Sequence, residues 1–409
     1  MGQREPTMTA KLPVYLDYNA TTPVDKRVLE AMLPFFCEDF GNPSSRSHTY
    51  GWKAEAACEV ARQQVAELIG ATPGEITWTA GATESNNLAI KGVCEMYRDR
   101  GQHVITCSTE HNAVLDPCAA LANAGWEVTQ IPVDKTGRVS PADIQAAITD
   151  QTVLISIMAA NNETGTLAPL AEIGRIAKQA GVLLHTDATQ AAGKIPIDVK
   201  SLGVDLLSLS AHKLYGPKGA GCLYVRRRGP RVRLIPQMHG GSHEKGLRSG
   251  TLNVPGIVGL GAAAEIAAND FAEDTKRILT LRNRLEKGLA EQLPEVHLNG
   301  HPVERLCNTA NLSFAYVEGE ALLMKLSGLA VSSGSACMSE SREPSHVLMA
   351  MQVPAAQANA AIRFSLGRPT TSEEIDFAIN AVVQAVRELR AISPLYELAN
   401  ENPNPASLK

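Results

Sequence analysis

Hydrophobic and polar positions follow two alternating patterns between residues 15 and 226. Short runs rich in β-branched residues predict strands, and apolar residues that recur every three or four positions predict helices over residues 54–69 and 170–180. The predicted strands cover residues 76–79, 104–107, 128–132, 153–158, 182–186, 206–209 and 221–225. Strands that alternate with helices imply βαβ crossovers, so we expect an α/β fold with a mostly parallel sheet covered on both faces.

The pattern changes after residue 250. The elements predicted there are a helix over residues 270–292, strands near residues 311–316 and 361–366, and a last helix over residues 372–389. We therefore expect a large domain over residues 14–261, a smaller α+β domain made of residues 1–13 and 262–395, and a disordered Asn- and Pro-rich tail over residues 396–409.

Composition excludes several classes of protein. The chain has 409 residues, of which 44% are hydrophobic and 20% charged, with a formal net charge of −5, and this balance excludes collagen-like, disordered and disulfide-rich small proteins. The N-terminus lacks the apolar region of a signal peptide and no apolar run is long enough to span a bilayer, so we expect a cytoplasmic protein without membrane association. The eight cysteines should then stay reduced, and none has the close spacing of a zinc motif.

Residues that follow the strands are the first candidates for a site, because ligands of parallel sheets bind beyond the carboxyl ends of the strands. Ala82 and Thr83 begin a helix after the strand 76–79, which suits a phosphate, although Thr83 is equally an ordinary helix cap. His111 follows the strand 104–107 and is therefore expected at the carboxyl edge of the sheet. A single histidine in a loop is, however, usually a solvated or capping residue.

Asp187 and Lys213 follow two further strands. Asp187 could pair with a cationic ring nitrogen or a metal, or could simply cap a turn. Lys213 lies in a glycine-rich turn, where it could form a Schiff base or stay a solvated surface cation. Because four strands each deliver a polar group to the same edge, we favour the functional interpretation.

Longer motifs then give a resemblance. They are VYLDYNATTP, GNPSSRSH, GATES, TEHNAVLD, NNETG, HTDATQ, SAHK, RSGT, SSGSAC and IRFSLGR, in this order from residue 14 to residue 368. Their order and spacing closely resemble the pyridoxal-phosphate-dependent cysteine desulfurases of the housekeeping and nitrogen-fixation types, in the class-V aminotransferase family. The resemblance implies fold type I, similar to aspartate aminotransferase, with a seven-stranded sheet, and a homodimer.

The resemblance also implies roles for matching residues around pyridoxal 5′-phosphate. Lys213 would hold the cofactor covalently, Asp187 would pair with its pyridinium nitrogen, and Gln190 would donate to its phenolate oxygen. His111 would stack over the ring and assist proton transfer. The phosphate would contact Ala82, Thr83, Ser210 and His212, with Thr251 from the other subunit. Asn162, at the cofactor, would fix the substrate carboxylate together with Arg363.

Cys337 is the implied nucleophile. Its thiolate would take sulfur from L-cysteine, leaving a persulfide and releasing L-alanine, and the sulfur would pass to an iron–sulfur scaffold protein, to other acceptors and to tRNA thiolation. The small and polar composition of residues 332–344 predicts an exposed loop rather than a buried cysteine. Cys337 is also a candidate ligand, through its persulfide, of a [2Fe–2S] cluster shared with the scaffold.

Some positions depart from the family pattern. Met338 and Arg342 differ within the cysteine loop, which bears on loop dynamics and partner preference, and Asn86 replaces a frequent Asp. NNETG resembles the nitrogen-fixation type, whereas YLDYNATTP and QMHGGSHEKGLRSGT resemble the housekeeping type, so the subtype stays open with the housekeeping type favoured. The arginine-rich segment 226–233 is either a solvated strand end, which we favour, or a docking surface for tRNA or an acidic partner. We expect no direct nucleic-acid binding.

Two other functions remain open from the sequence. A selenocysteine lyase or a transaminase would use the same cofactor, although SSGSAC argues against a transaminase. A non-enzymatic sulfur-carrier scaffold would make Lys213 a structural cation, and a colourless protein would support it.

Overall fold

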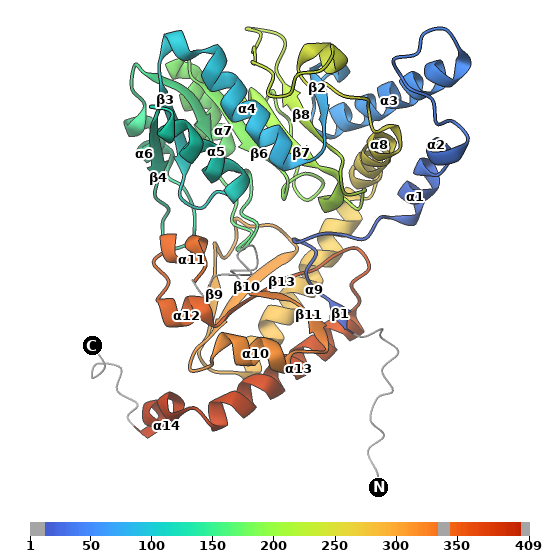
Figure 1. Ribbon diagram of the computed structural model, residues 1–409. Helices are drawn as coiled ribbons and strands as arrows, with labels where there is room; N and C mark the ends of the chain where they lie inside the picture. The colour runs from blue at the N-terminus through green and yellow to red at the C-terminus, as the bar shows by residue number, and fades with distance from the viewer. Residues whose placement is uncertain (1–12, 334–343, 402–409) are drawn as a thin grey trace.

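A seven-stranded sheet forms the centre of the larger part of the molecule (Figure 1). The computed structural model describes residues 13–333 and 344–401. The strands in spatial order are β2 (Ile76–Thr79), β8 (Gly221–Val225), β7 (Leu206–Ser210), β6 (Leu183–Asp187), β5 (Thr152–Ser156), β3 (His103–Cys107) and β4 (Glu127–Ile131). β8 alone runs antiparallel to its neighbours β2 and β7. The predicted mostly parallel seven-stranded sheet is therefore confirmed.

Helices cover both faces of this sheet. Neighbouring residues of a strand point to opposite faces, so Val104 packs with α4 (Ala82–Met96) and α5 (Asn112–Asn123), whereas Ile105 packs in the core on the other face. That second face is covered by α3 (Thr49–Leu68), α7 (Leu170–Ala180) and α8 (Val254–Asn269). Because both faces are buried, the strands are continuous hydrophobic runs rather than alternating ones.

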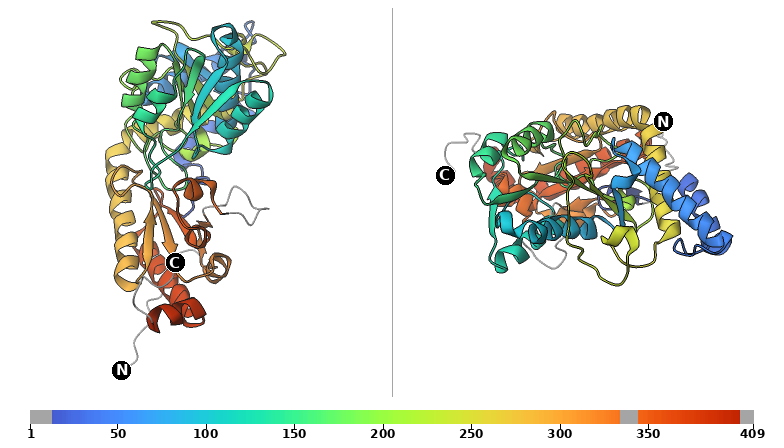
Figure 2. Two further views of the ribbon diagram at one scale, coloured as in Figure 1. Left: turned by 90° about the vertical axis from the view of Figure 1, so that its left-hand side faces the viewer. Right: turned by 90° about the horizontal axis from the view of Figure 1, so that it is seen from above.

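The smaller part contains a four-stranded antiparallel sheet beside two long helices. Its strands in spatial order are β12 (Ser332–Ser333), β13 (Ala361–Ser365), β10 (Thr309–Phe314) and β9 (Val296–Asn299). The long helices α9 (Phe271–Gln292) and α13 (Ser372–Ala391) pack on it through a separate hydrophobic core, and α9 extends from the larger part along the smaller one (Figure 2). The short helices are α1 (Lys26–Met32), α2 (Pro34–Cys37), α6 (Pro141–Ala147), α10 (Gly319–Lys325), α11 (His346–Ala350), α12 (Ala355–Asn359) and α14 (Pro394–Glu401).

The N-terminal segment joins the two parts. β1 (Val14–Tyr15) pairs in parallel with β11 (Leu329–Ala330), and Val14 and Leu16 are fully buried in the core of the smaller part. The core changes between α8 and α9, since Ala267 still packs in the larger core and Ile278 in the smaller one. The domain boundaries at residues 14 and 262 stay predictions.

The end of the chain differs from the expected disordered tail. Residues 394–401 form α14, where disorder was predicted from residue 396. Tyr396 of this helix stacks against Tyr316 with ring centroids 5.7 Å apart, and the guanidinium of Arg390 lies over the Tyr396 ring. These contacts explain the order of α14, and residues 402–409 lie outside the described ranges. In the described ranges no helix is long and apolar enough to cross a membrane.

Candidate active site

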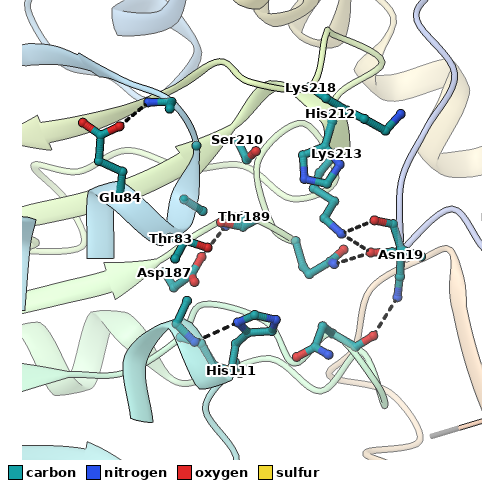
Figure 3. Close-up of a pocket in the computed structure, with 18 of the residues that line it drawn as sticks. Asn19, Thr83, Glu84, His111, Asp187, Thr189, Ser210, His212, Lys213 and Lys218 are labelled. Carbon is teal, nitrogen blue, oxygen red and sulfur yellow. Dashed lines mark hydrogen bonds between the residues drawn. The ribbon is translucent and has the colours of Figure 1, made fainter. Parts of the chain in front are cut away.

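A cavity of about 850 Å³ opens at the carboxyl ends of the strands (Figure 3). The predicted site residues that line it are Ala82, Thr83, His111, Asn162, Asp187, Gln190, Ser210, His212, Lys213 and Arg363. They come from both parts of the molecule, since Arg363 is in β13 and the others lie in or beside the large sheet. Thr251 is exposed and does not line the cavity of its own chain, and Cys337 lies outside the described residues.

Lys213 lies where the chain reverses between β7 and β8. The antiparallel return to β8 makes this segment a loop at the carboxyl edge, with Lys213 in the short 3₁₀ turn Ala211–Lys213. Its amine donates to the backbone oxygens of Asn19 at 2.5 Å and Ala20 at 2.6 Å. The amine is thus held at the cavity wall by the N-terminal segment.

Asp187 ends β6 with its carboxylate in the cavity. One oxygen accepts a 2.7 Å hydrogen bond from the Asn86 amide, and the other accepts a 2.9 Å bond from the backbone N–H of Thr189. His185, two residues earlier and fully buried, bridges the hydroxyls of Ser156 and Ser208 at 2.8 and 3.0 Å, and burial lowers the pKa of its imidazole to about 4. The carboxylate is therefore oriented by two uncharged donors.

A second group of residues forms a site for an anion. Ala82 and Thr83 occupy the first turn of α4, where backbone N–H groups lack helical acceptors. Ser210 and His212 face the same cavity from the end of β7. Close packing requires glycine at position 221, because a Cβ atom there would lie 2.5 Å from the Cα atom of Gly81. The missing side chain lets the turn before α4 lie directly against β8.

His111 caps α5 at the edge of the cavity. Its Nδ1 accepts a 3.0 Å hydrogen bond from the backbone N–H of Ala113, so the neutral ring carries its proton on Nε2. Burial lowers the pKa of the His111 imidazole, and the nearby Lys213 amine lowers it further. At neutral pH the ring is therefore uncharged and can accept or donate a proton.

Arg363 connects the smaller part to the cavity. Its guanidinium donates to Asp17 Oδ1 at 2.8 Å and to the backbone oxygen of Asn162 at 3.0 Å. The side chain is 6% exposed and keeps further N–H donors that these two bonds do not use. A buried guanidinium in this setting is suited to a carboxylate ligand.

Asn19 is a site residue to which the sequence analysis assigned no role. Its amide nitrogen donates to the oxygen of Asn162 at 3.1 Å and to Thr309 Oγ1 at 2.9 Å, and its backbone oxygen accepts from Lys213 and, at 2.9 Å, from Gln190. Asn19 thus contacts three of the predicted site residues. The only signal in the sequence was its place in the DYN motif. Other cavity residues that were not assigned include Ala20, Met158, Thr189, Lys218 and Gly219.

The described cysteines are poor candidates for a nucleophile. None of the seven lines the cavity, and six are partly or fully buried. Burial raises the pKa of each of these six thiols; they are Cys58, Cys94, Cys107, Cys118, Cys222 and Cys307. The remaining one, Cys37, is exposed on α2.

The residues present fit pyridoxal 5′-phosphate. An amine that can form a covalent link, a carboxylate and an anion site at a helix N-terminus line one cavity, with an imidazole and a guanidinium beside them. These are the partners that an aldehyde, a pyridinium nitrogen, a phosphate and an amino-acid carboxylate require. The sheet presents them in one place because its parallel strands end at the same edge.

Comparisons with known proteins agree with this geometry. The model of the class-V aminotransferase family matches residues 14–377. A cysteine desulfurase IscS from Anaeromyxobacter sp. (strain Fw109-5) is 59% identical over 391 residues, which are 96% of each chain. A human cysteine desulfurase is 52% identical over 97% of this chain and 87% of its own length.

Solved structures give the same relationship. A NifS-like protein superimposes with a TM-score of 0.86 at 41% identity, covering 92% of this chain and all of that one. A structure described as SspA in complex with cysteine gives a TM-score of 0.78 at 38% identity, over 88% of this chain and 100% of that one.

The chain therefore belongs to the class-V aminotransferase family, with a fold of type I. Sequence identity above 50% to cysteine desulfurases, over nearly the whole length of this chain, narrows the family to that kind of enzyme. The chain is a pyridoxal-phosphate-dependent cysteine desulfurase.

Proposed function

We propose that this enzyme converts L-cysteine to L-alanine and transfers the sulfur to Cys337 as a persulfide. The observation that carries the proposal is the convergence of Lys213, Asp187, His111 and Arg363 on one cavity. The reaction balances without an external oxidant, because the substrate C–S bond breaks, an S–S bond forms on Cys337, and the two protons needed by alanine and the persulfide come from the two thiols.

Lys213 and Asp187 are the proposed anchors of the cofactor. Lys213 would hold its aldehyde carbon covalently, and Asp187 would pair with its protonated ring nitrogen. When bound, pyridoxal phosphate supplies an electron-accepting ring that stabilises negative charge at the substrate Cα. Ala82, Thr83, Ser210 and His212 bind the phosphate, which is supported by their shared place in the cavity.

Substrate binding and proton transfer use a second group of residues. Arg363 and Asn162 fix the substrate carboxylate, which orients the Cα–H bond toward the catalytic groups. Lys213, once the substrate amine has displaced its own amine from the cofactor, would remove the Cα proton, and the neutral His111 ring would move a proton at its Nε2 atom. The low pKa of the His111 imidazole supports this role, because a charged ring could not accept a proton.

The assignment of Cys337 rests on the sequence and on chain connectivity. Ser333 is four residues before Cys337, and its neighbour Ser332 pairs with Arg363 in the small sheet. Four residues span at most about 14 Å. This short link to a cavity residue supports Cys337 over the buried cysteines.

A homodimer is part of the proposal. Large apolar side chains are exposed along the segment that runs from α1 through α2 to the start of α3. They include Leu33, Phe36, Phe40 and Trp52, each more than 50% exposed. This segment forms a corner that projects from the larger part in Figures 1 and 2. Thr251 is exposed outside its own cavity, as a residue that serves the second subunit's phosphate would be. Sedimentation velocity should give a species of twice the chain mass.

The further partners follow from the chemistry of the persulfide. We propose that the enzyme acts in the cytoplasm and donates sulfur to an iron–sulfur scaffold protein and to tRNA thiolation, with Cys337 as a [2Fe–2S] ligand when the scaffold is bound. The seven reduced cysteines of the described chain are compatible with a reducing compartment.

Mass spectrometry of the enzyme after incubation with L-cysteine tests the central step. We expect one added sulfur atom on the Cys337 peptide, with alanine in equal amount to the sulfur released. Cys337→Ala should abolish the added sulfur, while Cys37→Ala, a matched control at an exposed cysteine, should retain it. Sulfur transfer at the wild-type rate by Cys337→Ala would refute the assignment.

A further inference from the structure

A second lysine, Lys194, contacts the site from behind. It lies four residues after Gln190, and its amine donates 3.1 Å hydrogen bonds to both the side-chain oxygen and the backbone oxygen of Gln190. Gln190 lines the cavity, whereas Lys194 does not. Any effect of Lys194 on a ligand in the cavity therefore passes through Gln190.

The two ends of the Gln190 amide have opposite partners. Its oxygen accepts from the Lys194 amine, and its nitrogen donates to the backbone oxygen of Asn19 at 2.9 Å. Rotating the amide by 180° would place its NH₂ group against the amine and its oxygen against the Asn19 carbonyl, so both hydrogen bonds would be lost. Lys194 and Asn19 together select one orientation.

That orientation leaves one N–H of the amide nitrogen without a use in these contacts, because the nitrogen carries two protons and Asn19 takes one. We propose that Lys194 is a positioning residue, which holds Gln190 so that this second N–H donates to the phenolate oxygen of the cofactor. The inference rests on the proposed role of Gln190.

The contact between Lys194 and Gln190 does not depend on the protonation state of the Lys194 amine. Burial lowers the pKa of the Lys194 ammonium to about 7, with Lys213 and Arg363 lowering it further and Cys307 raising it. Both protonation states of the amine carry N–H donors, so the contact with Gln190 persists across the neutral range.

The visible absorption of the purified holoenzyme, titrated with pH, tests the proposal. Lys194→Met removes the donor that holds Gln190, which weakens the hydrogen bond from Gln190 to the phenolate, so we expect the midpoint of the spectral transition to rise by about one pH unit. Lys194→Arg, which can still donate, should restore the wild-type midpoint. Lys200→Met, at an exposed lysine of the same segment, should leave it unchanged.

A double variant separates positioning from a general structural effect. Gln190→Ala should raise the midpoint as well, and Lys194→Met combined with Gln190→Ala should raise it no further than Gln190→Ala alone. If Lys194→Met folds poorly, Lys194→Leu, which also lacks a donor, serves in the same series. A wild-type midpoint in the folded Lys194→Met variant, or shifts that add in the double variant, would overturn the inference.

The same variants distinguish a wrong role for Lys194 from a wrong role for Gln190 in the proposed function. If Gln190→Ala shifts the midpoint and Lys194→Met does not, only the role of Lys194 is wrong. If Gln190→Ala has no effect, Gln190 does not contact the phenolate and both assignments fail.

Discussion

The amide of Asn86 donates a 2.7 Å hydrogen bond to the carboxylate of Asp187. Asn86 is in the first turns of α4, beside the proposed phosphate site, and Asp187 ends β6, so the bond ties the two ends of the proposed cofactor site together. Both residues are buried, with 0% and 6% of their surfaces exposed. The orientation of the carboxylate therefore depends on the helix that binds the phosphate.

We expect Asn86→Ala to weaken cofactor binding. A hydrogen bond to a charged group contributes about 1.5–3 kcal/mol, which corresponds to a roughly 10- to 100-fold higher dissociation constant. Titration of the apoenzyme with pyridoxal phosphate, followed by absorbance, measures this constant. An unchanged constant would mean that Thr189 alone orients the carboxylate.

Asn19→Ala should reduce both stability and substrate affinity. The variant loses buried hydrogen bonds to Asn162, Thr309 and Asn308, at a cost of about 2–4 kcal/mol in the free energy of unfolding. Because the backbone oxygen of Asn162 loses one of its two donors and keeps only Arg363, KM for cysteine should rise more than kcat falls. Urea unfolding and steady-state kinetics measure the two effects, and a stable variant with an unchanged KM would contradict this role.

Arg363→Lys should raise KM for cysteine about 10- to 100-fold, although the positive charge is kept. A lysine cannot bind Asp17, the Asn162 oxygen and a carboxylate with the fixed geometry of a guanidinium. Arg284→Lys is a matched control, because Arg284 forms an exposed ion pair with Asp376 at 2.6 Å. Equal kinetics of the two variants would argue against Arg363 as the carboxylate ligand.

His185 should make the protein less stable in acid. Its folded pKa is about 4 and the ordinary value is 6.5, so the unfolded chain binds the proton more readily. The contribution is complete above pH 6.5 and is lost as the pH falls toward 4, by an amount on the order of 3 kcal/mol.

The comparison of wild type with His185→Gln isolates this contribution. Glutamine can still bond to Ser156 and Ser208 but does not titrate. Urea unfolding at pH 7, 6, 5 and 4 should show the wild type losing more stability than the variant. Parallel losses would assign the acid sensitivity to other groups, such as His212, whose pKa is also lowered to about 4 by burial.

The sequence predicted the large sheet well because both faces of its strands are buried. Hydrophobic runs such as residues 221–225 end where the sheet ends, and β8 and β2 match the predicted ranges. The helix at α3 begins at Thr49 rather than residue 54, since His48 caps it by accepting from the backbone N–H of Gly51. Such a local cap is not visible in the hydrophobic periodicity.

The site could be predicted only in part. Asp187 and Lys213 follow recognisable strands, and ten residues carried over from the resemblance line the cavity. Asn19 could not be found this way, because its partners are fixed by tertiary packing. Lys194 lies only four residues after Gln190, but no hydrophobic pattern indicates that its amine bonds to that side chain. Asn19 bonds to Asn308, 289 positions away, and no local pattern encodes that distance.

The positions of the site residues along the chain set the order in which the ribosome delivers them during synthesis. The residues from Ala82 to Lys213 emerge during synthesis well before Arg363, which is about 340 residues after Asn19. At about 5–20 residues per second, Asn19 and its neighbours wait roughly 20–70 s for β13 to arrive. A nascent chain can thus possess the groups proposed to capture the cofactor before it has the guanidinium proposed to select the amino acid.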